Sequence, residues 1–424
     1  MKNDKRPELS FHTFNDDWKC LKLSEIFKIL DGDRGKNYPH EEDFFENGDT
    51  LFLDTGNVRR NGFRFTKKKY ITKEKDRLLK GGKLEVYDFV LTSRGTLGNL
   101  AYYNQNQYKR NSSVRINSAM LILRPINRNE VVDSYMEAVL RGNLIHSYML
   151  HYQVGSAQPH ITKKGFSNMT VSMPSSLQEQ QQIGEFFKKI DEIIDFCQRK
   201  LELLKQTKQG FLQKMFPKEG ESVPELRFPG FTDDWEQHKL GEKLDLLKDG
   251  THGTHKDVDE GVYLLSAKNI KNGQIVIDGE TDRKISKDEF VSIHKNFSLE
   301  KGDVLLTIVG SIGESAIIEN PDGITFQRSV AYFRPTKDLS AQFLFTTIQN
   351  SEFQIELKKR QVVSAQPGIY LGDLSIIPIQ VPVVQEQQKI GSFFKQLDDT
   401  IALHQRELDL LKQTKKAFLQ KMFI

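Results

Sequence analysis

The residues that could perform catalysis do not form a recognisable catalytic motif in this sequence. The pair Gly82-Lys83 lacks both the upstream glycine and the following Ser/Thr of a phosphate-binding Walker A loop. The stretch Asn/Asp-Pro-Pro-Tyr/Phe, which is the signature of amino-methyltransferases, does not occur. Asp338 with Glu356 and Lys358 only loosely resembles the carboxylates and lysine of a nuclease, because the glutamate falls in a helical pattern. We therefore expect no catalytic residue in this chain.

Histidine and cysteine give no convincing pattern for a metal site. His252 and His255, in the segment DGTHGTH, could face a metal ion, but two loop histidines fall short of a full ligand set. We interpret them as polar loop residues and expect neither a metal nor a cofactor in this chain. Cys20 and Cys197 lie far apart without a CxxC partner, which excludes a disulfide framework and fits a reducing compartment.

Basic residues are concentrated in two segments of the first half. Residues 59–83 hold eleven Lys and Arg against two acidic residues, and residues 94–129 hold six against none, although the net charge is only +4. Residues 261–360, by contrast, hold thirteen of each sign. Such a concentration suits a phosphate-lined partner, that is, a nucleic acid. A solvated lysine-rich surface is the alternative.

Side chains able to read base edges lie among these cations. Arg, Asn and Gln make bidentate contacts to guanine and adenine, and Asn and Gln gather at residues 104–107, at Asn111 and at Asn117. For any single residue, ordinary polar loop composition is an equally good explanation. The candidate DNA contacts are Arg34, Lys36, Asn57, Arg59, Arg60, Lys67, Lys68, Arg94, Arg115, Asn117, Gln158, His252, His255, Lys268, Asn269, Lys271, Gln327, Arg328 and Gln366.

The elements that must position these residues occur twice along the chain. Residues 178–216 and 385–423 are identical at 26 of 39 positions without a gap, and PELSFHTFNDDW (7–18) returns as PELRFPGFTDDW (224–235). Fainter repeats are TSRGTLGN with TIVGSIGE and GSAQPHI with VSAQPGI. The chain is therefore a tandem duplication. Its near-identical ends must satisfy one constraint twice, whereas its divergent middles satisfy different ones.

Each repeated end has the spacing of a coiled-coil helix. Apolar residues recur at alternating intervals of four and three, and antiparallel pairing of the two copies would bury both seams. The seam residues are Ile183, Phe187, Ile190, Ile194, Leu201, Leu204 and Phe211 in the first copy and Ile390, Phe394, Leu397, Ile401, Leu408, Leu411 and Phe418 in the second. Lys208 and Lys415 occupy equivalent seam positions, where a polar residue commonly fixes the register. Recruitment of another coiled-coil protein is the alternative use of this seam.

The pattern predicts an α+β fold with bent antiparallel sheets in two tandem domains, related by an approximate twofold axis. We place the first domain at residues 1–175, its long helix at 176–217, a linker at 218–226, the second domain at 227–383 and its helix at 384–424. YDFVLTS, AMLILRP, GDVLLTIVG and SVAYFRP read as strands, and residues 131–151 and 339–360 read as helices. No apolar run approaches the roughly 18 residues of a membrane span, and no signal peptide is recognisable at the start. We expect a cytoplasmic protein.

Two variable domains, each opened by an FxxFxDDWE-like segment and closed by an EQQxIGxFF…LKQTKxxFLQKMF helix, resemble the specificity subunit of type I restriction–modification systems. GDRGKNYP (32–39) and DGTHGTH (249–255) look like the opening loops of two different types of target-recognition domain. The resemblance implies a subunit without enzymatic activity that reads a bipartite double-stranded DNA target. It also implies two modification subunits, which use S-adenosylmethionine to methylate adenine N6. Restriction subunits, with Mg²⁺ and ATP, would cleave unmethylated DNA.

Two other functions remain open, a coiled-coil scaffold without a DNA role and a self-contained DNA-modifying enzyme. The weak charge of the second domain departs from the expectation that both domains hold DNA. The strongest candidates are therefore those at aligned positions, where both copies keep a polar residue. These pairs are Asn57 with Asn269, Asn117 with Gln327, Ser156 with Ser364, and Gln158 with Gln366.

Overall fold

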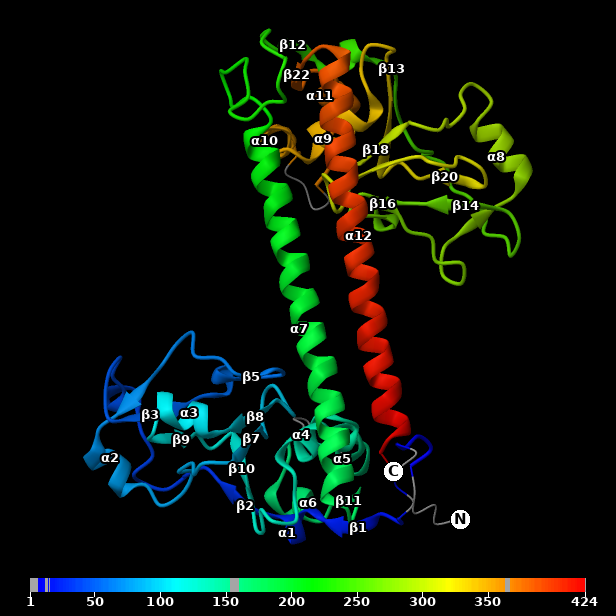
Figure 1. Cartoon of the computed structure of the whole chain (residues 1–424). Helices are drawn as coiled ribbons and strands as arrows, with labels where there is room; N and C mark the ends of the chain where they lie inside the picture. Colours follow the sequence, from blue (N-terminus) through cyan, green and yellow to red (C-terminus); the bar gives the residue numbers. More distant parts are fainter. Residues whose placement is uncertain (1–6, 12–13, 15, 153–159, 363–366, 424) are drawn as a thin grey trace. The chain divides into compact units, whose positions relative to one another are not determined.

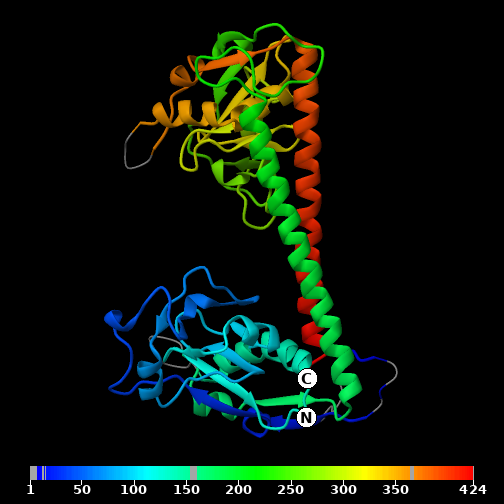
Figure 2. The same cartoon turned by 60° about the vertical axis from the view of Figure 1, so that its left-hand side comes forward.

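The computed structural model describes residues 7–11, 14, 16–152, 160–362 and 367–423 (Figure 1). The chain forms two compact units, one made of Met1–Cys197 with Glu407–Ile424 and the other of Gln198–Arg406. Two long helices, α7 (Leu177–Lys214) and α12 (Val384–Lys421), each contribute one part to each unit and run without a break (Figure 2). In the part of the chain that the structure describes, no helix is long and apolar enough to span a membrane.

The first unit contains the first domain, whose sheets have two to four strands each. Strand β1 (Lys19–Lys22) pairs with β11 (Thr170–Met173), and β4 (Val58–Arg59) forms a hairpin with β5 (Gly62–Phe63). The four-stranded sheet has the order β2 (Phe27–Asp31), β10 (Met120–Pro125), β7 (Asp88–Thr92), β8 (Leu100–Tyr103), and the three-stranded sheet has the order β6 (Tyr70–Ile71), β3 (Thr50–Leu53), β9 (Val114–Ile116). The helices are α1 (Leu23–Ile26), α2 (Lys73–Leu78), α3 (Gln105–Arg110), α4 (Asp133–Arg141), α5 (Leu144–Tyr152) and α6 (Lys163–Ser167).

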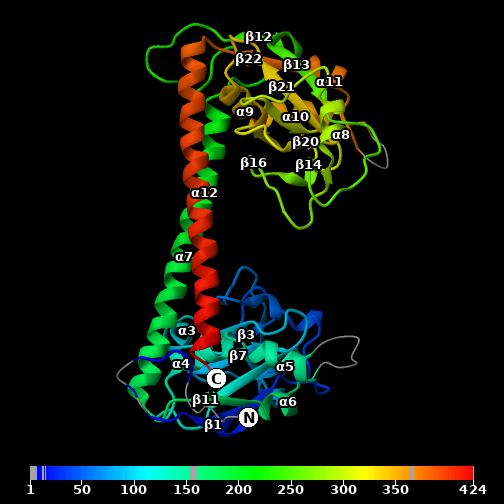
Figure 3. The same cartoon turned by 90° about the vertical axis from the view of Figure 1, so that its right-hand side faces the viewer.

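The second unit repeats this arrangement strand for strand. Strand β12 (Glu236–Lys239) pairs with β22 (Pro378–Val381), and β15 (Ile270–Lys271) forms a hairpin with β16 (Gln274–Ile275). The larger sheets have the orders β13 (Leu244–Asp249), β21 (Val330–Pro335), β18 (Val304–Thr307), β19 (Ser315–Ile317) and β17 (Lys284–Ile285), β14 (Val262–Leu265), β20 (Ile324–Phe326). The helices of the domain are α8 (Lys287–Ile293), α9 (Ala341–Gln349), α10 (Ser351–Lys359) and α11 (Leu371–Ser375), and α8 lies beside β14 and β20 (Figure 3).

The predicted α+β class and the four predicted strands are confirmed, but the sheets are not wholly antiparallel. Strand β3 runs parallel to β9, and β14 runs parallel to β20. Parallel strands are typically buried on both faces. All residues of β3, β9 and β20 are buried accordingly, so no alternation of polar and apolar residues marked these strands in the sequence.

Each of the two predicted domain helices is interrupted once. Residues 131–151 form α4 and α5, with Gly142 and Asn143 between them, and residues 339–360 form α9 and α10, with Asn350 between them. The Asn350 side chain caps α10 by accepting a hydrogen bond from the backbone N–H of Glu352, and it donates one to the carbonyl of Leu212 in α7. The prediction that both segments are helical is confirmed, and the interruptions arise because this asparagine and the glycine stop one helix and begin the next.

Aromatic residues fasten the long helices to each domain in the same way. In the first unit, Phe187 of α7 stacks on Phe423, with 5.5 Å between ring centroids, and both lie against the buried residues Trp18 and Tyr135. In the second unit, Phe394, Phe216, Trp235 and Phe343 form the equivalent cluster. Each buried aromatic ring removes roughly 150–250 Å² from water, so these clusters dominate the junction between helix and domain.

The two long helices also contact each other within each unit, and they run in opposite directions. In the first unit, Phe186 of α7 packs against Phe418 of α12 at 5.1 Å between centroids, and Asp191 pairs with Lys415. In the second unit, the equivalent contacts join Phe393 to Phe211 and Asp398 to Lys208. The predicted seam lysines therefore each meet an aspartate of the other helix.

The predicted seam residues all lie on the less exposed side of their helix. Ile183, Phe187, Ile194, Leu201, Ile390, Phe394 and Leu408 are buried, and Ile190, Leu204, Phe211, Leu397, Ile401, Leu411 and Phe418 are partly buried. A supercoil along the full length of the helices, with its knobs-into-holes packing, stays a prediction.

Candidate nucleic-acid interface

A glycine-rich loop of the same shape follows the central strand of each domain. In residues 92–99, the hydroxyl of Thr92 donates to the carbonyl of Thr96 and accepts from the backbone N–H of Asn99 at 2.9 Å. In residues 307–314, the Thr307 hydroxyl bonds the carbonyl of Ser311 and the N–H of Glu314 in the same manner. Gly95, Gly98, Gly310 and Gly313 all have positive φ, which glycine adopts without strain. The two loops therefore share one backbone conformation but carry different side chains.

In the first unit, this loop lies against two other loops that carry predicted contacts. The backbone N–H of Ser93 donates to the carbonyl of Ala119 at 2.8 Å, which joins the glycine-rich loop to the turn that contains Asn117. Gly32 lies so close to the Asn117 carbonyl that a side chain there would collide with it. The guanidinium of Arg34 donates to the carbonyl of Ser118 at 3.2 Å. The opening loop, the glycine-rich loop and residues 117–119 thus form one cluster.

The second unit assembles the equivalent cluster. The backbone N–H of Ile308 donates to the carbonyl of Ser329 at 2.9 Å, and that of Arg328 donates to the carbonyl of Thr251 at 3.0 Å. Gly250 has no room for a side chain beside the carbonyl of Gln327. The structure therefore brings the predicted residues of three separate segments together in both domains.

The opening loops of the two domains are fixed by different chemistry. In the first, the Asp33 carboxylate accepts backbone hydrogen bonds from Gly35 at 2.7 Å and from Lys80 at 2.6 Å. Burial opposes ionisation of Asp33, but these hydrogen bonds prevail and lower its pKa. In the second, the His255 ring bridges the Thr251 hydroxyl, at 2.7 Å, and the Glu289 carboxylate of α8, at 2.6 Å. Each opening loop is therefore held before any ligand arrives.

A short hairpin carries the most basic part of the first cluster. The β4–β5 hairpin is tied to the glycine-rich loop because the Asn99 amide donates to the carbonyl of Val58 at 3.0 Å. Its tip touches α7, where Asn61 donates to Asp195 at 3.0 Å. In the second domain, the N–H of Asn272 in the β15–β16 hairpin donates to Glu314 of the glycine-rich loop at 3.3 Å.

Most of the predicted contacts are exposed on or beside these loops. Arg34, Lys36, Arg59, Arg60, Lys67, Lys68, Arg94, His252, Lys268, Lys271 and Arg328 are exposed, and Asn117 and Gln327 are partly exposed. Lys268 is held at 2.8 Å from the Asp282 carboxylate and His252 at 2.5 Å from Asp249, so both already have a partner. The exposed cations stay predicted DNA contacts.

Four predicted contacts instead have largely buried side chains that bond to other groups of the protein. Asn57 and Asn269 are buried, and each amide organises its own loop by bonding a backbone carbonyl, Lys67 at 2.8 Å and Val276 at 2.9 Å. Arg115 is 5% exposed and pairs with Asp76, and the side chain of His255 is 8% exposed. In this arrangement the four side chains are engaged with the protein itself, so a structural role accounts for them, and their role as DNA contacts stays a prediction.

Gln158 and Gln366, together with Ser156 and Ser364, lie outside the described residues. The residues that follow them return to the clusters, since the N–H of Ile161 donates to Ser93 and that of Ile369 to Ile308. Asp33 was missed as the residue that fixes the first opening loop. An aspartate two residues before a glycine in GDRG is a turn signal, and it could have been recognised as such.

The two loosely nuclease-like carboxylates each belong to a separate structural contact. Asp338 pairs with Lys243 at 2.6 Å, and Glu356 pairs with Lys359 at 2.8 Å and with Arg360. Among the described residues, no group of three or more His, Cys, Asp or Glu side chains could hold a metal ion.

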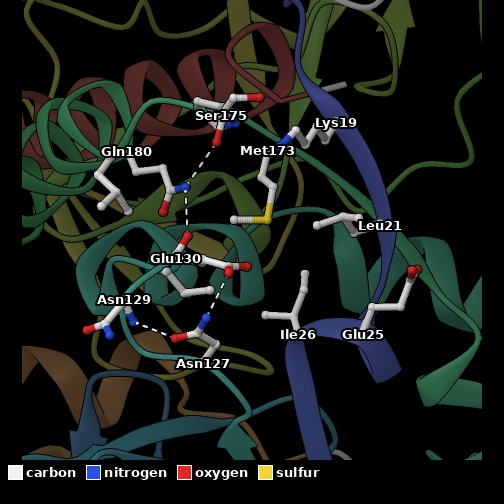
Figure 4. A pocket seen from close by; sticks show the side chains of 13 residues that line it. Lys19, Leu21, Glu25, Ile26, Asn127, Asn129, Glu130, Met173, Ser175 and Gln180 are labelled. Carbon is white, nitrogen blue, oxygen red and sulfur yellow. Dashed lines mark hydrogen bonds between the residues drawn. The ribbon is translucent and has the colours of Figure 1, made fainter.

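A cavity of the first domain lies beside the start of α7 (Figure 4). Gln180, which lines it, is engaged with the protein, since its amide donates to the carbonyls of Glu130 at 3.2 Å and Pro174 at 3.0 Å. Asn127 in turn donates to the Glu130 carboxylate at 2.7 Å. The cavity is therefore part of the junction between the domain and α7.

These repeated loop clusters with different side chains suit a DNA-recognition component, and the comparison with known families shows that class. The chain belongs to the family of type I restriction modification DNA specificity domains, whose family model matches residues 15–206 and again residues 232–413. The two target-recognition domains predicted from the repeat are thereby confirmed. Membership of this family makes the chain a recognition subunit rather than a catalytic one.

Relatives match over most of the chain. The specificity subunit of the type I restriction enzyme MjaVIII from Methanocaldococcus jannaschii is 24% identical over 416 residues, which cover 95% of this chain and 91% of the relative. The EcoBI specificity subunit from Escherichia coli is 27% identical over 169 residues, which cover 39% of this chain and 35% of the relative.

Solved structures share the fold. The S subunit of a type I restriction–modification system from M. genitalium matches with a TM-score of 0.61 at 15% identity, over 99% of each chain. A chain from a study of complex assembly in a type I system matches with a TM-score of 0.57 at 16% identity, over 96% of this chain and 97% of that one.

Proposed function

We propose that this chain reads a bipartite double-stranded DNA target, one half per domain, and scaffolds the modification and restriction subunits of a type I complex. The observation that carries the proposal is the repeated loop cluster, in which one backbone frame presents different side chains in the two domains. The first cluster presents Arg34, Arg94 and the basic β4–β5 hairpin, and the second presents His252, Gln327 and Arg328. Different side chains at equivalent places read different bases.

The long helices offer two equivalent docking faces for the modification subunits. Phe196 and Leu203 lie one heptad apart on α7 and are 61% and 62% exposed, and Leu403 and Leu410 on α12 are 53% and 64% exposed. These are the same positions of the repeat, 207 residues apart. Large apolar side chains repeated on an exposed helix face favour a helical partner. Two such faces support two copies of one modification subunit.

The chemistry belongs to those partners in this proposal. The modification subunits would bind S-adenosylmethionine and methylate adenine N6, and the restriction subunits would use Mg²⁺ and ATP. The whole complex would work in the cytoplasm, where the host DNA lies. A coiled-coil scaffold without a DNA role would need none of the exposed cations beside the loop clusters.

Coexpression with the modification subunit of its own type I system tests the proposal. Native mass spectrometry should show two modification subunits per chain, and Phe196→Glu or Leu403→Glu should each remove one of them. Lys412→Glu, an exposed charged position on α12, is the matched control and should retain both. Retention of both copies by the two apolar variants, or a complex without salt-dependent DNA binding, would contradict the proposal.

A further inference from the structure

The cations of the second domain are largely neutralised at the positions where the first domain is basic. The β4–β5 hairpin of the first domain exposes Arg59 and Arg60, whereas the β15–β16 hairpin offers only Lys271. Nearby, Lys268 pairs with Asp282 at 2.8 Å, and Arg283 pairs with Asp257 at 2.6 Å. Lys271 and Arg328 remain exposed there, but a grip on DNA phosphates as strong as that of the first domain calls for further cations at another place.

A shallow groove beside the glycine-rich loop of the second domain provides such a place. It is lined by Ile312 of that loop, by Ser351, Gln354, Ile355 and Lys358 of α10, and by Gln361. The four residues of α10 follow the i, i+3, i+4, i+7 spacing and so share one face of the helix. Gln354 fixes the position of the loop, since its amide donates to the carbonyl of Gly313 at 3.1 Å.

Lys358 is the cation of this groove that is free to bind a ligand. Its neighbours Lys359 and Arg360 are both paired with Glu356. Lys358 is exposed, and no carboxylate pairs with it among the residues that the structure describes. The groove therefore has an unneutralised ammonium group at the side of an apolar and amide-lined floor.

Among its described residues, the first domain shows no groove of this kind beside its glycine-rich loop and carries a cation on the loop itself. There, Ile145 of α5 packs against Gly98 at the place where Gln354 meets Gly313. Arg94 is exposed on the first glycine-rich loop, whereas Val309 holds the corresponding position of the second loop. The positive charge thus lies on the glycine-rich loop itself in the first domain and on α10, which faces that loop, in the second.

We propose that the groove between the glycine-rich loop and α10 binds the DNA backbone at the second half-site, with Lys358 as the cation that contacts a phosphate. This inference rests on the proposed function and names a phosphate-binding site for its second domain. DNA is favoured over an acidic peptide because Ile312 belongs to the loop that joins the predicted base-reading residues, through the hydrogen bond of Ile308 to Ser329. A ligand that lies across the cluster would pass over this loop into the groove.

The test is a salt titration with the full complex of this chain and its modification subunits on a duplex that carries its target. Loss of one phosphate contact lowers the slope of log K against log salt by about one. Lys358→Gln should show this decrease, and Lys358→Arg should keep the slope of the unchanged complex. Lys301→Gln is the matched control, because Lys301 is exposed at the other end of β18 and pairs with Glu319.

The outcomes separate this inference from the proposed function. If the unchanged complex shows no salt-dependent binding to DNA, both fail. If it binds and Lys358→Gln leaves the slope as it was, only the assignment of the groove fails. A Lys358→Gln complex that loses a protein subunit, with an unaltered slope, would assign the groove to a protein partner and would equally overturn the inference.

Discussion

The two copies of the repeat differ in their loops and agree in the contacts that join domain to helix. Gln180 donates to two backbone carbonyls and accepts from the N–H of Val132, and Gln387 does the same with the N–H of Ser340. The buried carboxylates of Asp88 and Asp303 each accept two hydrogen bonds from an arginine of the neighbouring strand. We call this set of contacts, which both copies share, the frame. Because the frame is the same in both copies, loop residues can change without loss of the fold.

The opening loops show what that freedom allows. Asp33 holds the first loop through backbone N–H groups, and His255 holds the second through Thr251 and Glu289. Both sets of contacts tie the opening loop to residues in or just after a short helix, which is α2 after β6 in the first domain and α8 after β17 in the second. The position of the loop is therefore conserved between the copies although its chemistry is not.

One further contact, outside this shared set, differs between the copies. Glu386 is fully buried and accepts two hydrogen bonds from Arg227, at 2.7 and 2.8 Å. The equivalent Glu179 accepts one from the Trp18 indole at 3.2 Å, and among the described residues its other oxygen has no hydrogen-bond partner. Ser10 occupies the position of Arg227 in the first copy, so the first unit buries a carboxylate without its cation.

If the frame is equivalent in both copies, removing the same ring from each should have the same large effect. Phe187→Ala and Phe394→Ala should each destabilise their own unit by about 3–5 kcal/mol, because both rings are buried in an aromatic cluster. The two tryptophans lie one in each cluster, so denaturant unfolding of the Trp18→Phe or Trp235→Phe background reports each unit separately. A loss below about 1 kcal/mol in either unit would contradict the equivalence.

Removing the arginine beside Glu386 and adding one beside Glu179 should change the stability of the two units in opposite directions. Arg227→Ala should destabilise the second unit by about 3–5 kcal/mol, since it leaves a buried charge without its partner. Ser10→Arg should stabilise the first unit by about 1 kcal/mol, because Ser10 occupies the position of Arg227 in the repeat and its neighbour Leu9 is held in the same way as Leu226. Leu9 and Leu226 each donate a backbone hydrogen bond to a lysine carbonyl near the end of a long helix, at 2.9 and 2.7 Å. The same fluorescence-monitored unfolding measures both, and a destabilising Ser10→Arg would refute the comparison.

The two ion pairs between the long helices should be exchangeable. Lys208→Asp places two carboxylates together at a partly buried position, and we expect a loss on the order of 1–3 kcal/mol in the second unit. Lys208→Asp with Asp398→Lys restores an attractive pair and should recover most of that loss. Thermal unfolding of the single and double variants measures it, with Lys205→Asp on the exposed face as the control. A double variant as unstable as the single one would show that the pair does not act as a unit.

The smallest expected effect is the contribution of Glu179, the buried carboxylate of the first unit, to the pH dependence of stability. Burial raises the pKa of Glu179, against the effect of the hydrogen bond from Trp18. The folded chain then holds this proton more tightly than the unfolded chain, so stability falls as pH rises from the ordinary glutamate pKa through the folded one. Glu179→Gln should remove this part of the dependence in denaturant unfolding at a series of pH values. An unchanged pH profile would mean that Glu179 is not ionised or not buried as described.

The sequence was sufficient to predict the frame because its constraints are periodic or repeated. The spacing of Phe187 and Phe394, the lysines of the seam and the four strands all follow from repeats or periodicity. The interruption at Asn350 and the parallel strands could not be predicted, because they depend on contacts with distant residues such as Leu212. Burial of Asn57 and Arg115 was missed for the same reason, since composition reports the polarity of a loop residue and not its orientation.

The central claim, that each domain reads its own half of one target, is tested most directly by mapping methylated adenines in the DNA of a host that expresses the chain with its modification subunit. The account predicts one bipartite motif with two dissimilar halves and a fixed gap. Exchange of residues 18–174 for another first domain should change one half and leave the other intact. A single contiguous motif, or a change in both halves after the exchange, would contradict it.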